Sequence, residues 1–317
     1  MRLCVFGAGG LLGRAVVDAF SAAGHSVTTV SVIWSDVTLF TTQTTEQLTS
    51  FLKGVSPGEP WAILWCAGAG FVGVDQAILD TETGCLQALL TVLKSLRQQF
   101  DVQQPGTFFF SSSAGGVYGR CDDVPITESS EPLPVSPYGH AKLKQENLLR
   151  DYCAAEQGLR LLIGRFSNLY GANQNLKKPQ GLISHIARSI VAHHPINIFV
   201  PLDVLRDYLH VRDAAALTLQ AIEHLETAPA GTQVMKVFAT GQPASVAEIL
   251  GTFRRLTRRK VATVIAVRPE TGLQPRRLVF QSRVHPEWTR DRWVPLLQGI
   301  NEVLTAEQSR GFGHRPD

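Results

Sequence analysis

Three regularly spaced glycines near the N-terminus constrain the fold of this chain more than any other stretch. The apolar residues Leu3 to Phe6 have the pattern of a short buried strand, and Gly7, Gly10 and Gly13 follow at intervals of three. The next segment has the spacing of a helix with one apolar face, formed by Leu12, Val16, Ala19 and Ala23. A strand, a glycine turn and a helix in this order predict the first unit of a doubly wound parallel α/β sheet, with a dinucleotide at the helix N-terminus.

Each glycine has a separate role in such a site. Gly7 allows the tight turn, Gly10 lets backbone N–H groups approach a pyrophosphate, and Gly13 permits close packing of helix on strand. We therefore expect cofactor contacts from this loop and the start of the helix, at Gly7, Gly10, Leu11, Leu12 and Gly13. The spacing differs from the Gly-x-Gly-x-x-Gly of most dinucleotide-binding dehydrogenases, and a purely structural turn is the alternative.

Strands and helices alternate along the rest of the first half. Small residues, Ala67 and Gly68, follow one of the buried strands and leave room for a cofactor at the carboxyl end of that strand. The alternation predicts a parallel sheet with helices on both faces. The expected elements are strands 26–32, 62–66 and 107–110 and helices 46–52, 86–96 and 138 to about 157.

The end of the second expected strand bears on the choice of cofactor. Sites that prefer NAD usually place an acidic residue there for the adenosine ribose, but this chain has Ser31 and Val32. The missing carboxylate and the nearby Arg14 keep NADP open as well as NAD. Asp36 and Val37 could hold the edge of the adenine, or could form a surface turn.

Tyr138 and Lys142 are the leading candidates for acid/base chemistry. Residues four apart on a helix present their side chains on the same face. A phenol has a pKa of about 10, so a tyrosine needs a neighbouring cation before it can act as a base near neutral pH. Lys142 has the right spacing to be that cation. Chance spacing of two surface residues is the alternative, and hydroxyls at Ser111 to Ser113 after the strand 107–110 argue against it.

Composition excludes several classes of protein. The apolar runs of this 317-residue chain are far shorter than the roughly 20 residues that a membrane span needs. The N-terminus becomes glycine-rich too early for a signal peptide, so we expect a cytoplasmic protein. The five cysteines contain no C-x-x-C motif and are odd in number, so we expect reduced thiols and no metal site.

The net charge of +3 is unevenly distributed. After residue 250 there are 13 Lys and Arg against 6 Asp and Glu. Three interpretations are open for this basic part: a solvated helix face, a site for a diphosphate substrate, or a nucleic-acid patch. We expect no nucleic-acid partner.

The chain resembles the extended short-chain dehydrogenase/reductases of the NAD-dependent epimerase/dehydratase kind. The resemblance rests on six motifs that occur in family order and together span nearly the whole chain. They are Gly7-x-x-Gly10-x-x-Gly13, Ser111-Ser112-Ser113-Ala114-x-x-Val117-Tyr118-Gly119, Ser136-Pro137-Tyr138-x-x-x-Lys142, Arg165-x-x-Asn168-x-Tyr170-Gly171, Arg206-Asp207-Tyr208-Leu209-His210-Val211-x-Asp213, and Trp293-x-Pro295 with Gly299-Ile300.

The resemblance implies a role for each matching residue. Tyr138 would be the general acid/base on a substrate oxygen, Lys142 would hold the nicotinamide ribose, and Ser113 would hydrogen-bond the same oxygen. Ser167 would join the cofactor site. Asn168, Arg206 and Tyr208 match positions that contact a nucleoside diphosphate in sugar-nucleotide members, although a surface ion pair of Arg206 with Asp207 is the alternative. Many members carry an Arg-x-x-Asp clamp near Pro275, where this chain offers Arg276 or Arg277 without the Asp.

The resemblance also implies an activity. We expect a nucleotide-sugar epimerase that moves hydride to and from a bound cofactor at a ring carbon, with C4 as the expected position. An NADPH-dependent 4-keto reductase and a non-catalytic NAD(P)-binding protein are the alternatives. Dehydration is disfavoured, because Ser113-Ala114-Gly115 stands where dehydratases have Thr-Asp-Glu. Family usage favours NAD.

Two parts are expected in the chain. A Rossmann domain would take residues 1–170 and about 207–235, and a smaller C-terminal α/β substrate domain would take about 171–206 and 236–310. The cleft between them would bind a nucleoside diphosphate sugar. We expect a homodimer with no membrane partner.

Overall fold

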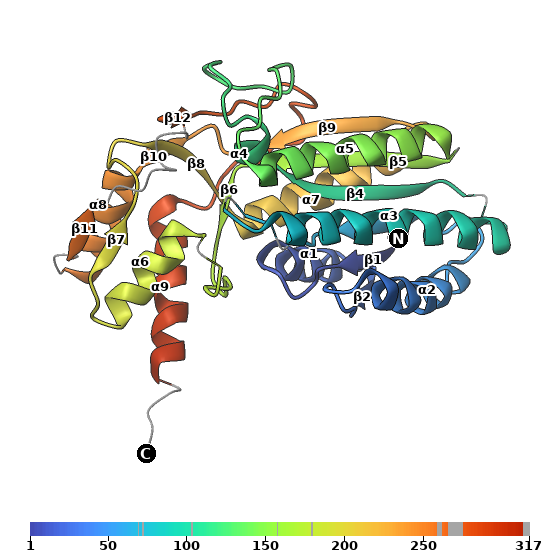
Figure 1. Ribbon diagram of the computed structural model, residues 1–317, viewed down its shortest axis with the longest axis horizontal. Coiled ribbons are helices and arrows are strands. Elements are labelled where there is room, and N and C mark those ends of the chain that lie inside the picture. The colour runs from blue at the N-terminus through green and yellow to red at the C-terminus, as the bar shows by residue number, and fades with distance from the viewer. Residues whose placement is uncertain are drawn as a thin grey trace.

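The computed structural model describes residues 1–68, 70–71, 73–102, 104–156, 158–178, 180–258, 262–265 and 275–312. Two parts lie side by side in it, a larger one built on a broad sheet and a smaller one that carries the C-terminal helix (Figure 1). None of the helices in these ranges is long and apolar enough to cross a membrane.

The larger part is built on a six-stranded sheet in which all neighbouring strands are parallel. The order is β2-β1-β3-β4-β5-β9, so the chain winds outward from β1 in both directions. This confirms the expected doubly wound sheet. The strands are β1 Arg2–Phe6, β2 Ser26–Val30, β3 Trp61–Trp65, β4 Gly106–Ser113, β5 Leu159–Phe166 and β9 Gln233–Phe238.

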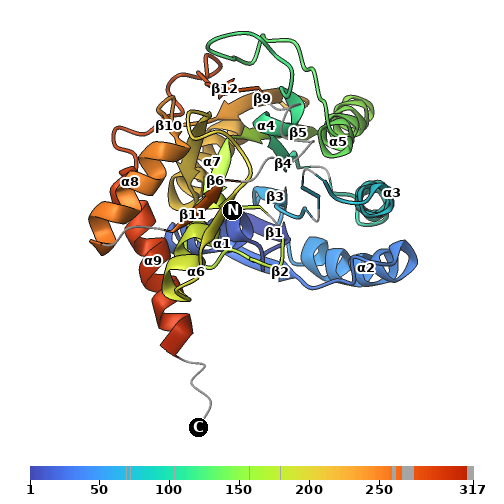
Figure 2. The same cartoon turned by 60° about the vertical axis from the view of Figure 1, so that its left-hand side comes forward.

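Helices cover both faces of this sheet and bury two apolar clusters. On one face lie α1 Leu11–Ala22 and α7 Val211–Glu226, which pack on each other. On the other face lie α2 Val37–Lys53, α3 Gln76–Gln99 and α5 Pro137–Ala155. Figure 2 shows α3 beside α5, and the two helices are in contact. The short helix α4 Ala114–Val117 follows β4 directly.

Two of these helices are longer than expected. Helix α2 begins at Val37 rather than at residue 46, although threonine has a low helix propensity. Its threonine hydroxyls bond back to the preceding turn, as Thr41 does to the carbonyl of Val37 at 2.6 Å, and Asp36 caps its N-terminus. Helix α3 begins at Gln76, ten residues before the expected start at 86. Its first turns expose Ile78 and bury the polar Glu82 and Thr83, so their apolar pattern is weak.

The smaller part is organised around β8 Leu205–His210, which pairs with β6 Asn168–Tyr170, β10 Pro243–Ser245 and β12 Arg277–Leu278. The pair β7 Ile196–Ile198 and β11 Thr263–Ile265 forms a separate ribbon. Helices α6 Leu182–Val191, α8 Val246–Thr257 and α9 Leu296–Phe312 contribute to its apolar core.

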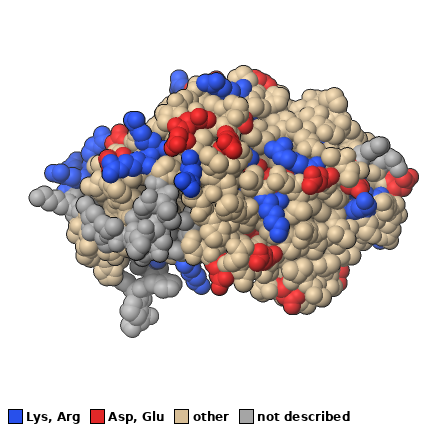
Figure 3. Space-filling view, turned by 45° about the horizontal axis from the view of Figure 1, so that its top comes forward, with Lys and Arg blue, Asp and Glu red and all other residues tan. Residues whose placement is uncertain are grey.

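The expected division of the chain into two domains stays a prediction. Helix α7 and strand β9 return to the larger part, and β9 continues to Phe238, slightly past the expected boundary at 235. Figure 3 shows Lys and Arg side chains gathered at the end of the molecule that the smaller part forms.

Candidate active site

The glycine loop brings α1 tightly against the carboxyl edge of the sheet. Gly7 has a φ of +80°, and a Cβ there would lie 2.6 Å from the Cα of Ala67, at the end of β3. A Cβ at Gly13 would lie only 2.1 Å from the carbonyl oxygen of Gly7, and the N–H of Gly10 donates to that oxygen at 2.9 Å. The structure therefore brings together Gly7, Gly10, Gly13 and Ala67, as the cofactor prediction requires.

The N-terminus of α1 has the features of an anion site. Gly10 is exposed and caps the helix without a side chain, and the first turn contains no acidic residue. Orphan N–H groups and the positive end of the helix dipole therefore face outward. Leu11 and Leu12 are the first two residues of this helix, and the side chain of Leu12 is buried. Arg14 is exposed in the first turn of the same helix, so the loop fits a dinucleotide pyrophosphate.

The residues predicted to hold the adenine have a structural task as well. Asp36 Oδ1 accepts hydrogen bonds from the N–H groups of Thr38 at 2.8 Å and Leu39 at 3.0 Å, which caps α2. Val37 is exposed in the first turn. The backbone of Ser31 is held on both sides by the amide of Gln47. The adenine contact stays a prediction.

Tyr138 and Ser113 both lie close to the backbone of Gly116. Ser113 ends β4 and caps α4, where its Oγ accepts from the N–H of Gly116 at 3.1 Å. A Cβ at Gly116 would lie 3.0 Å from Tyr138 Cε1 and 3.3 Å from Ser113 Oγ. A Cβ at Gly70 would lie 2.7 Å from Cδ2 on the other edge of the same ring. Two glycine backbones thus confine the Tyr138 ring beside the Ser113 hydroxyl.

Lys142 lies one turn further along α5 and is almost completely buried, at 3% exposure. Its ammonium donates to Glu82 Oε1 at 3.0 Å and lies over the Phe110 ring. Burial lowers the pKa of Lys142, but the neighbouring Glu82 carboxylate, Tyr138 and Glu146 outweigh it, so the net shift is upward.

Two further charged residues lie in this site, and neither belongs to a motif that the sequence reveals. Glu82 lies on the buried face of α3 between Leu79 and Leu86, and a carboxylate within an apolar stripe was the available signal. Lys178, from the segment after β6, donates to the carbonyl of Gly68 at 2.7 Å. Gly68 in turn lies close to Lys142, since a Cβ there would be 3.9 Å from the ammonium.

A buried ion pair supports the strands and helix beneath these residues. Arg165 on β5 binds both carboxylate oxygens of Glu146 on α5, with a shortest distance of 2.6 Å. Glu146 also accepts from Ser112 at 2.6 Å, and Arg165 donates to the Tyr118 hydroxyl at 2.6 Å. This network links β5 to β4, which carries Ser113, and to α5, which carries Tyr138.

Three of the predicted substrate residues come together on β6 and β8. Asn168 pairs in register with Tyr208, and Arg206 lies two residues earlier on the same face of β8. Burial lowers the pKa of Arg206, and burial raises the pKa of Tyr208 to about 12, against the opposing effect of Arg206. Arg206 Nη1 donates to the carbonyls of Leu205 and Arg276.

The neighbouring Asp207 excludes the alternative of a surface ion pair with Arg206. Its side chain is fully buried and points to the other face of β8. It accepts hydrogen bonds from Ser167 Oγ at 2.6 Å and from the backbone and hydroxyl of Thr240. The proton of the Ser167 hydroxyl is therefore already donated, so only its oxygen lone pairs remain for a cofactor.

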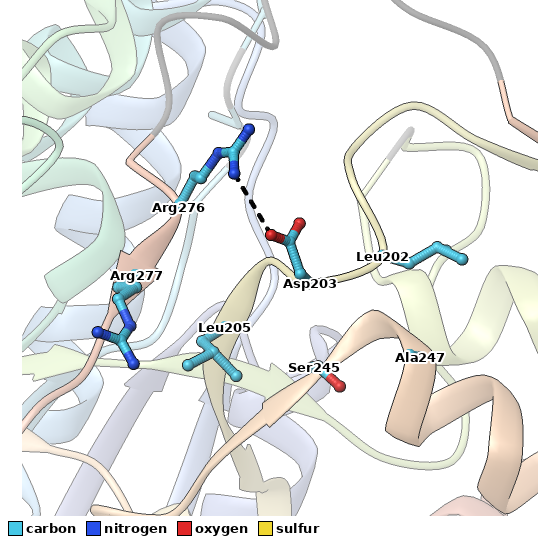
Figure 4. A pocket seen from close by; sticks show the side chains of 7 residues that line it. All are labelled: Leu202, Asp203, Leu205, Ser245, Ala247, Arg276 and Arg277. Atoms are coloured by element: carbon cyan, nitrogen blue, oxygen red, sulfur yellow. Dashed lines mark hydrogen bonds and ion pairs between the residues drawn. The ribbon is translucent and has the colours of Figure 1, made fainter.

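Arg276 lies beside a cavity of about 590 Å³ at the edge of β8 (Figure 4). Its guanidinium points at Asp203, with 3.4 Å between Nη1 and Oδ2, and both side chains are exposed. The predicted role of Arg276 in substrate binding stays a prediction. The cavity is lined by Leu202, Asp203, Leu205, Ser245, Ala247, Arg276 and Arg277.

The chain is similar to known proteins both in sequence and in structure. The chain is 30% identical over 211 residues to the UDP-glucose 4-epimerase of Azospirillum brasilense, covering 62% of this chain and 59% of that protein. It is similar to the structure of UDP-glucose 4-epimerase from Brucella ovis in complex with NAD, at 22% identity and a TM-score of 0.81 over 97% of this chain and 98% of that one. It is also similar to RMD from Pseudomonas aeruginosa complexed with NADPH, at 22% identity and a TM-score of 0.77 over 98% and 99% of the two chains.

The matched segment spans less than two thirds of the length of the Azospirillum epimerase. The structural similarity supports the fold, and the neighbours named above bind NAD or NADPH. The model of the NAD dependent epimerase/dehydratase family matches residues 3–235, well over half of the chain. The glycine loop, the Tyr138 and Lys142 helix and the Rossmann sheet all lie within that match, and the chain belongs to the NAD dependent epimerase/dehydratase family.

Proposed function

We propose that this protein is a nucleotide-sugar epimerase acting at a ring carbon, with C4 as the position. The observation that carries the proposal is the convergence of Ser113, Tyr138 and Lys142 at the carboxyl edge of the sheet, beside the glycine loop. Similarity to UDP-glucose 4-epimerases supports the same reaction.

Each residue has a separate task in this proposal. The glycine loop and the N-terminus of α1 hold the pyrophosphate of a nicotinamide dinucleotide, and Lys142 holds its nicotinamide ribose. The bound cofactor supplies the acceptor and donor of hydride. Tyr138 takes the proton from the ring hydroxyl when the carbinol is oxidised. It returns this proton when hydride is added back, after the keto sugar has rotated in the site. Ser113 donates a hydrogen bond to the same oxygen and stabilises its developing charge.

The substrate side of the proposal rests on β6 and β8. Arg206 offers a planar fork of donors that suits a diphosphate, and Asn168 and Tyr208 lie beside it. Dehydration stays disfavoured, because Ala114 is buried and apolar and Gly115 carries no side chain. The chain therefore lacks an acid and a base for eliminating water at the positions where dehydratases carry them.

An NADPH-dependent 4-keto reductase is the second candidate, and one observation favours it. The backbone that follows β2 is held by Gln47 and Gln43, and residues 31–35 contain no carboxylate to repel a 2′-phosphate. Copurification distinguishes the two candidates. An epimerase retains NAD through gel filtration, because it regenerates its cofactor in each cycle. A reductase releases cofactor, and its empty site then takes NADPH.

The experiment that tests the proposal combines ligand binding with one substitution. A ligand that binds only the folded state raises the melting temperature, so NAD, NADP and a series of nucleoside diphosphate sugars are screened by thermal shift. Turnover is then measured with the sugars that bind, for wild type and for Tyr138→Phe. We expect Tyr138→Phe to lose about 10²- to 10⁴-fold in kcat, the usual contribution of a general acid/base, while it still binds cofactor.

Tyr152→Phe is the matched control. Tyr152 lies on the same helix, is half-buried, and its hydroxyl has no hydrogen-bond partner among the described residues. We expect this variant to turn over like wild type. Full activity in Tyr138→Phe would refute the assignment of the acid/base.

A further inference from the structure

Glu82 is a buried carboxylate at the centre of the candidate site, and it contacts three groups at once. It accepts from the Lys142 ammonium at 3.0 Å, from the backbone N–H of Gly70 at 3.2 Å and from the Gln145 amide at 3.4 Å. Only 5% of the residue is exposed. These contacts link α3, α5 and the segment after β3, because α3 and α5 lie side by side (Figures 1 and 2).

Two of the residues that Glu82 contacts are neighbours of Tyr138. Lys142 lies four residues after Tyr138 on α5, so both side chains share one face of the helix. Gly70 packs against the Tyr138 ring, where a Cβ would come within 2.7 Å of Cδ2. Glu82 therefore fixes both the cation beside the phenol and the backbone that confines the phenol ring.

The charge of Lys142 depends on Glu82 for a physical reason. A buried ammonium without a partner carries a large desolvation cost and loses its proton more easily. Among the described residues, the charged or titratable groups that also interact with Lys142 or Glu82 include Tyr138 and Glu146 on α5, Cys85 on α3 and Lys178 from the segment after β6. Glu146 is already compensated by Arg165, and Lys178 has the same sign as Lys142.

We infer that Glu82 is a positioning residue that keeps Lys142 charged and fixed beside Tyr138 and the cofactor. The inference rests on the proposed function, since it assigns Lys142 its task there. It extends the site of Ser113, Tyr138 and Lys142 by a residue from a helix that none of the six sequence motifs includes.

Substitution of Glu82 by glutamine tests the inference. Glutamine has nearly the same shape and still offers an oxygen to the Gly70 N–H, but it removes the charge. The pKa of Lys142 then falls, because burial lowers it and the largest opposing effect is gone. A group that works only when protonated loses its function as the pH rises through its pKa. We therefore expect the alkaline limb of kcat/KM to move to lower pH by about one unit or more, as for loss of a directly contacting opposite charge.

Cofactor affinity provides a second measurement that needs no sugar substrate. The dissociation constants of NADH and NADPH are measured by fluorescence across the alkaline range. We expect the affinity of Glu82→Gln to weaken at a lower pH than that of wild type. If no sugar is turned over by wild type, the proposed function fails, but this titration still tests the link between Glu82 and Lys142.

Glu156→Gln is the matched control. Glu156 follows the same helix α5 and binds Lys94 of α3 at 2.7 Å, but Lys94 is half-exposed and the pair lies at the other end of both helices. We expect its pH dependence to match wild type. Glu82→Asp keeps the charge, but its side chain is shorter by one methylene and the carboxylate lies further from Lys142. We therefore expect the alkaline limb of this variant to move to lower pH by less than that of Glu82→Gln. This variant carries the test if Glu82→Gln does not fold. A folded Glu82 variant whose alkaline limb and cofactor titration both coincide with wild type would overturn the inference.

Discussion

Replacement of Gly13 by alanine provides a demanding test of the cofactor loop. A Cβ at this position would lie 2.1 Å from the carbonyl oxygen of Gly7, 2.8 Å from its carbonyl carbon and 2.9 Å from the Cα of Ala8. All three atoms belong to backbone, so no side chain can rotate away. Since nonbonded carbon atoms prefer about 3.5 Å or more, α1 and the loop must move apart by roughly 1 Å.

The magnitude follows from opposing effects. Overpacking of this kind costs about 1–3 kcal/mol, while alanine in place of glycine within a helix contributes up to about 1 kcal/mol. The net loss is about 1–2 kcal/mol, which lowers the melting temperature of a 317-residue chain by about 1.5–3 °C. Displacing one N–H from the pyrophosphate removes a hydrogen bond to a charged group, worth about 1.5–3 kcal/mol. Cofactor affinity should then fall by roughly ten- to one hundredfold.

The assay measures the melting temperature and the dissociation constant for NADH or NADPH. Gly9→Ala is the matched control, because a Cβ at Gly9 would meet nothing within 4 Å and its φ is not in the left-handed region. We expect the free energy of unfolding of that variant to stay within about 0.5 kcal/mol of the wild-type value. A Gly13→Ala protein with the stability and cofactor affinity of Gly9→Ala would refute the reasoning.

Two further predictions concern the substrate strand and the dependence of stability on pH. Arg206→Lys loses the planar set of guanidinium donors that can bind a diphosphate at two points. The Kd for a nucleoside diphosphate, measured by calorimetry, should therefore rise by about tenfold or more. Arg2→Lys, at the start of β1 on the edge of the larger sheet opposite the site, should bind like wild type. Burial lowers the pKa of His210 below its ordinary value, so the unfolded chain binds more protons and stability falls as the pH drops below about 6.5. In urea titrations, His210→Asn should flatten this slope, since asparagine keeps an acceptor for the helix cap. An unchanged slope would contradict the assignment.

Elements with local signals were predictable from the sequence. The turn at Gly7 needs a backbone that only glycine adopts readily, so its position was visible in the residue type. The helix that carries Tyr138 and Lys142 begins after Ser136, whose hydroxyl caps it. Helix α2 was underestimated, because the hydroxyl bonds that stabilise its threonines form only within the folded helix.

The arrangement of charges could not be predicted in the same way. Asp207 follows Arg206 in the sequence, which suggested a surface ion pair, but adjacent strand residues face opposite sides and Asp207 is buried against Ser167 and Thr240. Glu82 is 60 residues from Lys142 in the sequence, and no local pattern predicts their contact. Only the packing of α3 on α5 brings them together.

The sequence by itself determined the parallel sheet, the glycine loop and the placement of Tyr138 and Lys142 on one face of a helix. Each of these features depends on residue types at fixed short spacing. The tertiary structure alone decided what surrounds these two residues. It placed Gly70 and Gly116 on the two edges of the Tyr138 ring and Glu82 on the Lys142 ammonium. The physical reason is that a buried charge takes its partner from whichever element packs against it, and that element is selected by the fold as a whole.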